Sequence, residues 1–139
     1  MNEQHLVKMH FLSHPDRLCL IRVVVKRAAE SMGCSEKLAE KMVLAVNEAC
    51  MNIIQHAYKG DYSREIVLEI LNNDNHIKFR ITDHAEPVDL SCVKPRDLDD
   101  LRPGGLGTHF MQEIMDECAM GHLEGGRGNY IEMIKNINK

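Results

Sequence analysis

The feature that most constrains the fold of this chain is the stretch 35–59, in which apolar residues recur at helical spacing. The pattern predicts one long amphipathic helix with its apolar face packed against the rest of a globular domain. Ser35 is a suitable N-cap for this helix, and Gly60 follows its expected end. The stripe and its flanks are made of Leu38, Met42, Ala45, Val46, Ala49, Cys50, Ile53, Ile54 and Ala57.

Two polar residues, Glu48 and Asn52, lie within this mostly apolar region. They are four residues apart, so they project from the same side of the helix. A carboxylate and an amide among apolar neighbours need partners, because burying them unpaired is costly. Hydrated Mg²⁺ would satisfy both, since it prefers oxygen ligands and usually takes one or two protein ligands together with nucleotide phosphates. Taken alone, such a pair is more often the polar edge of an amphipathic helix.

The remaining elements predict an α+β fold of one domain, 1–139. Alternation over 65–71 and 76–82, with turn residues at 72–75, predicts a hairpin. Helices gathered on one face of a mixed, mostly antiparallel sheet would give a two-layer α/β sandwich. The other predicted elements are a strand at 5–13, a helix from Pro15 to Met32 that is capped by Gly33, a loop at 83–103, a helix after Gly107, and strands at 119–123 and 130–137.

Composition narrows the functional classes. The formal net charge is -4 over 139 residues, so no electrostatic feature favours direct binding of nucleic acid. Neither a signal-peptide pattern nor an apolar run of roughly 18 residues is found, so we expect a cytoplasmic protein without a membrane segment. The five cysteines include no C-x-x-C pair and indicate reduced thiols. Cys19 and Cys50 lie among apolar residues and are expected in the core.

Two further stretches have the chemistry of a nucleotide site. Gly104-Gly105-Leu106-Gly107-Thr108 precedes a helical pattern, where glycines allow close approach and free N–H groups favour phosphate. Asp83 ends a strand with alternating apolar residues. Its carboxylate could accept a hydrogen bond from an exocyclic amine such as that of adenine. The alternative for Asp83 is an Asx-turn at the strand end.

The order of these motifs carries a family resemblance over most of the chain. Glu-x3-Asn-x3-His-Ala-Tyr on a helix, Asp-x-x-x-Pro after a hairpin and Gly-Gly-Leu-Gly before a helix occur in that order. The set resembles the Bergerat-type nucleotide-binding fold of the GHKL superfamily, which includes histidine kinases, gyrase-type ATPases and Hsp90. It is most similar to the bacterial anti-sigma-factor serine kinases, whose last strand resembles Gly128 to Lys135 here.

The resemblance implies roles for specific residues. Asn52 would be the Mg²⁺ ligand, Glu48 would orient or deprotonate the attacking hydroxyl, and Asp83 would hold the adenine amine. The segment 88–103 would be the lid over ATP. The remaining residues assigned to nucleotide binding are Ala85, Pro87, Gly105, Leu106, Gly107 and Thr108.

Two positions depart from the family pattern. Ala85 replaces the glycine of Asp-x-Gly-x-Pro, and alanine is harmless there only if its φ is negative. Thr108 replaces a residue that is often hydrophobic. Both departures bear on ATP affinity and turnover more than on the fold.

The leading hypothesis is an ATP–Mg²⁺-dependent serine/threonine protein kinase that is also an anti-sigma factor. It would phosphorylate a small STAS-type antagonist, an anti-anti-sigma protein, and would hold a sigma factor inactive. One alternative is a non-catalytic ATP-binding switch that regulates a partner by docking. Another is the catalytic domain of a histidine kinase, although no phosphoacceptor-helix region precedes the first strand. We expect the apolar strand at 5–13 to lie at a sheet edge, and together with the family resemblance it predicts a homodimer.

Overall fold

The computed structural model describes residues 3–86 and 111–137. The first strand, β1 (Gln4–Leu12), leads through a 3₁₀ turn at Pro15–Arg17 into α1 (Leu18–Ser31). Next comes α2 (Glu36–Asn52), which continues as a π-helix over Ile53–Ala57. The hairpin of β2 (Glu65–Asn72) and β3 (His76–Asp83) follows, and the chain closes with β4 (Glu117–His122) and β5 (Asn129–Asn136).

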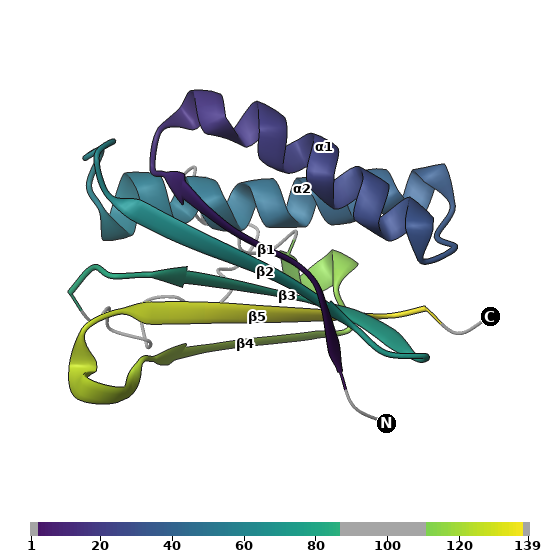
Figure 1. Cartoon of the computed structure of the whole chain (residues 1–139). Coiled ribbons are helices and arrows are strands. Elements are labelled where there is room, and N and C mark those ends of the chain that lie inside the picture. The colour runs from purple at the N-terminus through teal and green to yellow at the C-terminus, as the bar shows by residue number, and fades with distance from the viewer. Residues whose placement is uncertain (1–2, 87–110, 138–139) are drawn as a thin grey trace.

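The five strands form one sheet in the order β1-β2-β3-β5-β4, and every neighbouring pair in this described part is antiparallel. Helices α1 and α2 pack against each other over one face of this sheet (Figure 1). The architecture confirms the predicted two-layer α+β sandwich. It also confirms that the first strand lies at a sheet edge, next to β2.

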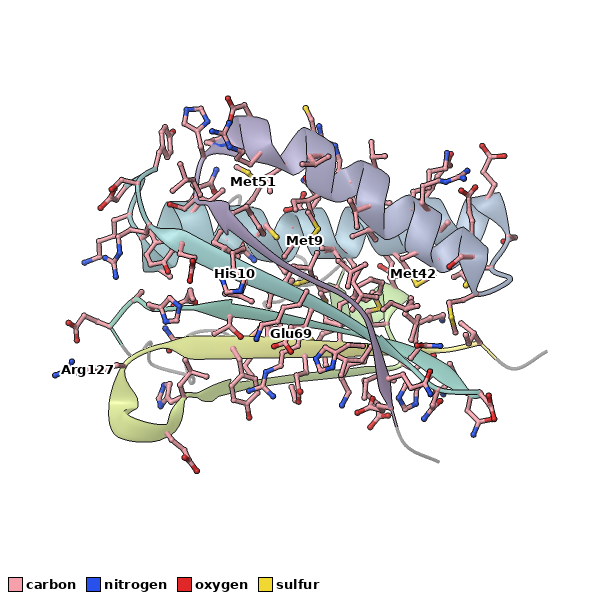
Figure 2. All side chains as sticks on the ribbon, viewed as in Figure 1. Met9, His10, Met42, Met51, Glu69 and Arg127 are labelled. Carbon is pink, nitrogen blue, oxygen red and sulfur yellow. The ribbon has the colours of Figure 1, made fainter. Side chains whose placement is uncertain are left out.

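The core lies between the two layers because each element has an apolar face of the expected period. Val25 and Ala29 of α1 and Met42 of α2 are fully buried, as are Leu68 and Phe79 from the sheet. Met9 packs against this core from β1, whereas Glu69 projects from the other face of the sheet (Figure 2).

Helix starts and ends follow the predicted chemistry. The Ser35 side chain accepts a hydrogen bond from the Leu38 N–H at 3.1 Å, which caps α2. Gly33, with φ +89°, follows α1 in the left-handed region that glycine adopts without a steric penalty. The cap residues therefore agree with the start of α2 and the end of α1, whereas the helix expected from Pro15 opens with a 3₁₀ turn and α1 itself begins at Leu18.

One core assignment was wrong. Cys50 is buried as expected, and its burial raises the pKa of the thiol to about 12. Cys19, in contrast, is exposed. The buried face of α1 consists of Leu18, Ile21, Val25 and Ala29, and Cys19 lies one residue off that stripe, which turns its side chain away from the sheet.

Candidate nucleotide site

Glu48 and Asn52 stand one helical turn apart near the end of α2, and both are half-buried. Their neighbours Ala49, Cys50 and Ile53 are buried in the core, so the pair lies at the border of the apolar face. Within residues 3–86 and 111–137, neither side chain has a hydrogen bond or ion pair. The oxygens of the pair therefore remain available to a ligand.

The helix changes its hydrogen-bond pattern immediately after Asn52. We expected one helix up to residue 59, but residues Ile53–Ala57 form a π-helix, and the Tyr58 N–H bonds to the Ile53 carbonyl at 2.8 Å. A π turn holds an extra residue, and such turns are frequent at functional sites. Lys59 and Gly60, with φ of +52° and +81°, then end the helical run.

Asp83 is the buried carboxylate of the candidate site, with 3% of its surface exposed. Its Oδ1 accepts two hydrogen bonds, from the Ala85 N–H at 2.9 Å and from the Asn129 side-chain amide at 2.9 Å. The first of these is the Asx-turn that was the alternative for this residue. No partner among the described residues occupies Oδ2. One oxygen thus holds the local fold and the other can accept from a ligand, so the two interpretations of Asp83 are compatible.

Asn129 is a residue that the sequence interpretation missed. It faces Asp83 in the register between β3 and β5 and is 5% exposed. Its side-chain amide also donates to the Glu86 carbonyl at 3.1 Å, so it ties the carboxylate to the loop that follows. The sequence signal was present in the closing Gly128-Asn129 pair, but only the pairing of β5 with β3 shows what it contacts.

Gly128 makes the approach of β5 to Asp83 possible. Its φ is +144°, and a Cβ at this position would lie 2.5 Å from the Asp83 carbonyl oxygen and 2.7 Å from Leu123 Cδ1. Any side chain would therefore push β5 away from Asp83.

Ala85 is compatible with the loop in this structure. Lys59 is the one non-glycine residue with positive φ among the described residues, so Ala85 does not need a glycine conformation. Its side chain is buried against the core and its N–H is bonded to Asp83. Pro87, Gly105, Leu106, Gly107, Thr108 and the expected lid at 88–103 lie outside the described residues.

The elements that carry the candidate site residues lie at one end of the molecule, although they are distant in sequence. The end of α2, the end of β3 and the start of β5 are found at the same end of the molecule (Figure 1). Tyr58 connects two of them, because its hydroxyl accepts from the His84 N–H at 2.7 Å. The described part of the chain thus gathers Asp83 and the α2 terminus around a single edge of the sandwich.

The oxygen donors of the candidate site suit Mg²⁺, which takes few protein ligands, better than a metal ion whose ligands all come from the protein. Among the described residues, no group of three or more His, Cys, Asp or Glu side chains could hold a metal ion. The Asn52 amide oxygen, which has no partner among the described residues, is the kind of hard ligand that Mg²⁺ takes when phosphates and water complete its shell.

Comparison with protein families identifies the chain. The model of the histidine kinase-like ATPase domain matches residues 11–135. The serine-protein kinase RsbW of Bacillus pumilus is 30% identical, with 100% of this chain and 91% of the relative covered. RsbW of Bacillus licheniformis is 32% identical, with 96% and 86% covered.

Solved structures support the same fold. A chain in the SiaB–SiaC complex from Pseudomonas aeruginosa matches with a TM-score of 0.69 and 15% identity, covering 96% of this chain and 91% of that one. The structure of the RsbU and RsbW domains of a Mycobacterium tuberculosis protein gives a TM-score of 0.65 and 14% identity, covering 97% of this chain and 32% of that one. At these identities the likeness concerns the fold.

Family membership confirms the resemblance that the three motifs indicated, and an ATPase family confirms ATP as the predicted nucleotide. No helix within the described residues is long and apolar enough to cross a bilayer. The chain belongs to the histidine kinase-like ATPase domain family and, within it, to the serine-protein kinases of the RsbW type.

Proposed function

We propose that this protein transfers the γ-phosphoryl group of ATP, with Mg²⁺, to a serine or threonine of a small STAS-type antagonist protein, and that it is an anti-sigma factor in a partner-switching pathway. The relatives named serine-protein kinase RsbW support the activity. The observation that carries the proposal is the pair Glu48 and Asn52, which has no partner among the described residues. The pair lies near the end of α2, at the same end of the fold as the end of β3, where Asp83 is the last residue (Figure 1).

Each residue has a separate task in this proposal. Asn52 supplies an amide oxygen to Mg²⁺, which neutralises phosphate charge when bound. Asp83 accepts a hydrogen bond from the adenine amine through Oδ2, while Oδ1 stays bonded to Ala85 and Asn129. The other assigned nucleotide contacts are Ala85, Pro87, Gly105, Leu106, Gly107 and Thr108, with the glycines admitting the phosphates.

Glu48 acts on the substrate hydroxyl rather than on the nucleotide. It precedes Asn52 by one helical turn, so it faces the phosphate region without having to hold the metal. A carboxylate there can accept the hydroxyl proton or orient the hydroxyl for in-line attack. The protein contributes positioning and charge stabilisation, which is what phosphoryl transfer requires.

In this proposal, the phosphorylated antagonist that the reaction produces also regulates which partner the protein binds. Phosphorylation adds roughly two negative charges and three acceptor oxygens to the antagonist. The modified antagonist then leaves, and the freed surface holds the sigma factor inactive. Because ATP and a sigma factor are both found where transcription takes place, we assign the protein to the cytoplasm.

The protein would work as a homodimer. The β1 strand is a sheet edge, and Leu6 and Leu12 on it are 40% and 46% exposed. An edge with unpaired backbone groups and exposed apolar side chains favours association. Sedimentation at micromolar concentration should give a dimer, and a monomer would contradict this part of the proposal.

The docking-only alternative was slightly favoured by Ala85 in place of the family glycine. Ala85 has no positive φ and its N–H is bonded to Asp83, so the backbone of the loop accepts alanine. Transfer of labelled γ-phosphate from ATP to a STAS-domain protein from the same genome distinguishes the two. Transfer supports the kinase, whereas binding of ATP and partner without transfer supports the switch.

A further inference from the structure

We propose that Tyr58 is a positioning residue that sets the adenine end of the site, a role that rests on the proposed function. Tyr58 closes the Glu48–Tyr58 motif, six residues after Asn52. Its side chain is 4% exposed, and its hydroxyl makes two hydrogen bonds to backbone groups. It accepts from the His84 N–H at 2.7 Å and donates to the Glu65 carbonyl at 2.5 Å.

These two bonds fix the end of one strand against the start of another. Glu65 is the first residue of β2 and His84 directly follows the last residue of β3. Because His84 is joined to Asp83 by one peptide bond, a fixed His84 N–H restricts how the Asp83 backbone can turn. Tyr58 therefore acts on the adenine acceptor through the backbone, without touching a ligand.

A second side chain holds the other backbone group of His84. The Arg64 Nη2 donates to the His84 carbonyl at 3.0 Å, and its guanidinium lies over the Tyr58 ring at 4.7 Å. Both the N–H and the carbonyl of His84 are thus bonded to side chains. Hydrogen bonds to both backbone groups fix the orientation of the His84 peptide units. We call Tyr58 and Arg64 together the His84 clamp.

The π-helix explains how Tyr58 can link the α2 end of the site to the β3 end. Glu48 and Asn52 lie on α2, and the π-helix Ile53–Ala57 separates them from Tyr58. The extra residue in the π turn rotates Tyr58 relative to the preceding α-helical residues. The rigid path Asn52–Tyr58–His84–Asp83 then defines the spacing between the proposed metal ligand and the proposed adenine acceptor.

Burial keeps the hydroxyl in its donating form. Desolvation raises the pKa of Tyr58, so the phenol remains protonated at neutral pH and can donate to Glu65. The ring can be retained by phenylalanine, which removes only the hydroxyl. A purely packing role would therefore survive Tyr58→Phe, and a positioning role would not.

The test compares Tyr58→Phe with Tyr62→Phe. Tyr62 is 46% exposed, packs near the His14 ring, and its hydroxyl has no hydrogen bond within the described residues. Calorimetry with Mg²⁺ should show about tenfold weaker ATP binding for Tyr58→Phe, as expected for loss of a hydrogen bond or two, and unchanged binding for Tyr62→Phe. Binding of GTP should change by less than about twofold, so the preference for ATP shrinks.

Arg64→Met is a second variant at an exposed position. It should weaken ATP binding about threefold with little change in melting temperature, because it removes one of the two His84 contacts. If Tyr58→Phe is too unstable to assay, the ATP affinity of Arg64→Met alone tests the positioning role of the His84 clamp. ATP affinity unchanged in the folded variants would overturn the proposal.

Amide hydrogen exchange separates failure of this inference from failure of the proposed function. In the nucleotide-free protein, exchange at 83–86 should accelerate in Tyr58→Phe but not in Tyr62→Phe, while α2 keeps its protection. If wild-type protein binds no ATP, the proposed function is wrong, yet faster exchange still supports the clamp. Unchanged exchange at 83–86 contradicts it in either case.

Discussion

The Asn129 side-chain amide donates a hydrogen bond to Asp83 Oδ1 over 2.9 Å, across the register pair that joins β5 to β3. The same Oδ1 also accepts from the Ala85 N–H. Because both protein donors use Oδ1, Oδ2 remains for the adenine amine that we propose it binds. That division makes the two roles separable by mutation.

The Asp83→Asn variant should fold normally but lose its affinity for ATP. Asparagine retains an acceptor for Ala85 and Asn129 but places an N–H₂ where Oδ2 was, so a donor would face the adenine amine. Asp83→Ala removes both side-chain oxygens. It should also lower the free energy of unfolding by about 2 kcal/mol, because the buried donors of Ala85 and Asn129 lose their acceptor. Thermal melts and ATP calorimetry on both variants test this. Retained ATP affinity in a folded Asp83→Asn protein would rule out the adenine role.

Binding of ATP should require both Mg²⁺ and Asn52. In the proposed site the Asn52 amide is one of the few protein ligands of Mg²⁺, so its loss and the loss of the metal should have overlapping effects. Calorimetry of wild type and Asn52→Ala, each with Mg²⁺ or with EDTA, gives four titrations. Gln55→Ala, an exposed amide of the π-helix, is the matched control. Equal affinity in all four titrations would remove Asn52 from the site.

Gly128→Ala should be far more damaging than Gly125→Ala. Both glycines have positive φ, +144° and +84°, so both substitutions strain the backbone by roughly 1 kcal/mol. A Cβ on residue 128 would also collide with the Asp83 carbonyl, whereas nothing lies within 4 Å of one on residue 125. Chemical denaturation should show an additional loss of about 2 kcal/mol at Gly128. Equal losses would mean that β5 does not approach Asp83 so closely.

Glu3 should contribute stability that depends on pH. Hydrogen bonds from His76 and Lys78 lower the pKa of Glu3. A carboxyl with a lowered folded-state pKa stabilises the protein above its unfolded pKa of about 4.3, and this contribution disappears as the pH falls through the folded pKa. Glu3→Gln should cost about 0.5–1 kcal/mol at pH 7 and nothing near pH 2. A difference independent of pH would contradict the ion-pair account.

Much of the fold could be predicted because its signals are local. The hairpin was expected at 65–71 and 76–82 and is found at Glu65–Asn72 and His76–Asp83, since alternation and turn residues define it within one segment. The Ser35 cap and the edge position of β1 also agree with expectation.

The support of the site could not be predicted, because it depends on contacts between distant segments. Tyr58 bonds His84 across 26 positions, and Asn129 bonds Asp83 across 46. Neither contact has a periodic pattern in the sequence. The π turn after Asn52 likewise has no composition signal, because Ile53–Ala57 also satisfies α-helical spacing.

The most direct test of the central claim is γ-phosphoryl transfer by Glu48→Gln. Glutamine keeps the shape of Glu48 but cannot accept a proton, so turnover toward a STAS-domain antagonist should fall on the order of a hundredfold. ATP affinity should stay within a few-fold of wild type, because in the proposed mechanism Asn52, and not Glu48, holds the metal. Transfer of labelled phosphate is measured beside ATP calorimetry on the same preparation. Wild-type turnover in Glu48→Gln, or parallel loss of ATP binding and transfer, would contradict the assignment of Glu48 to the chemical step.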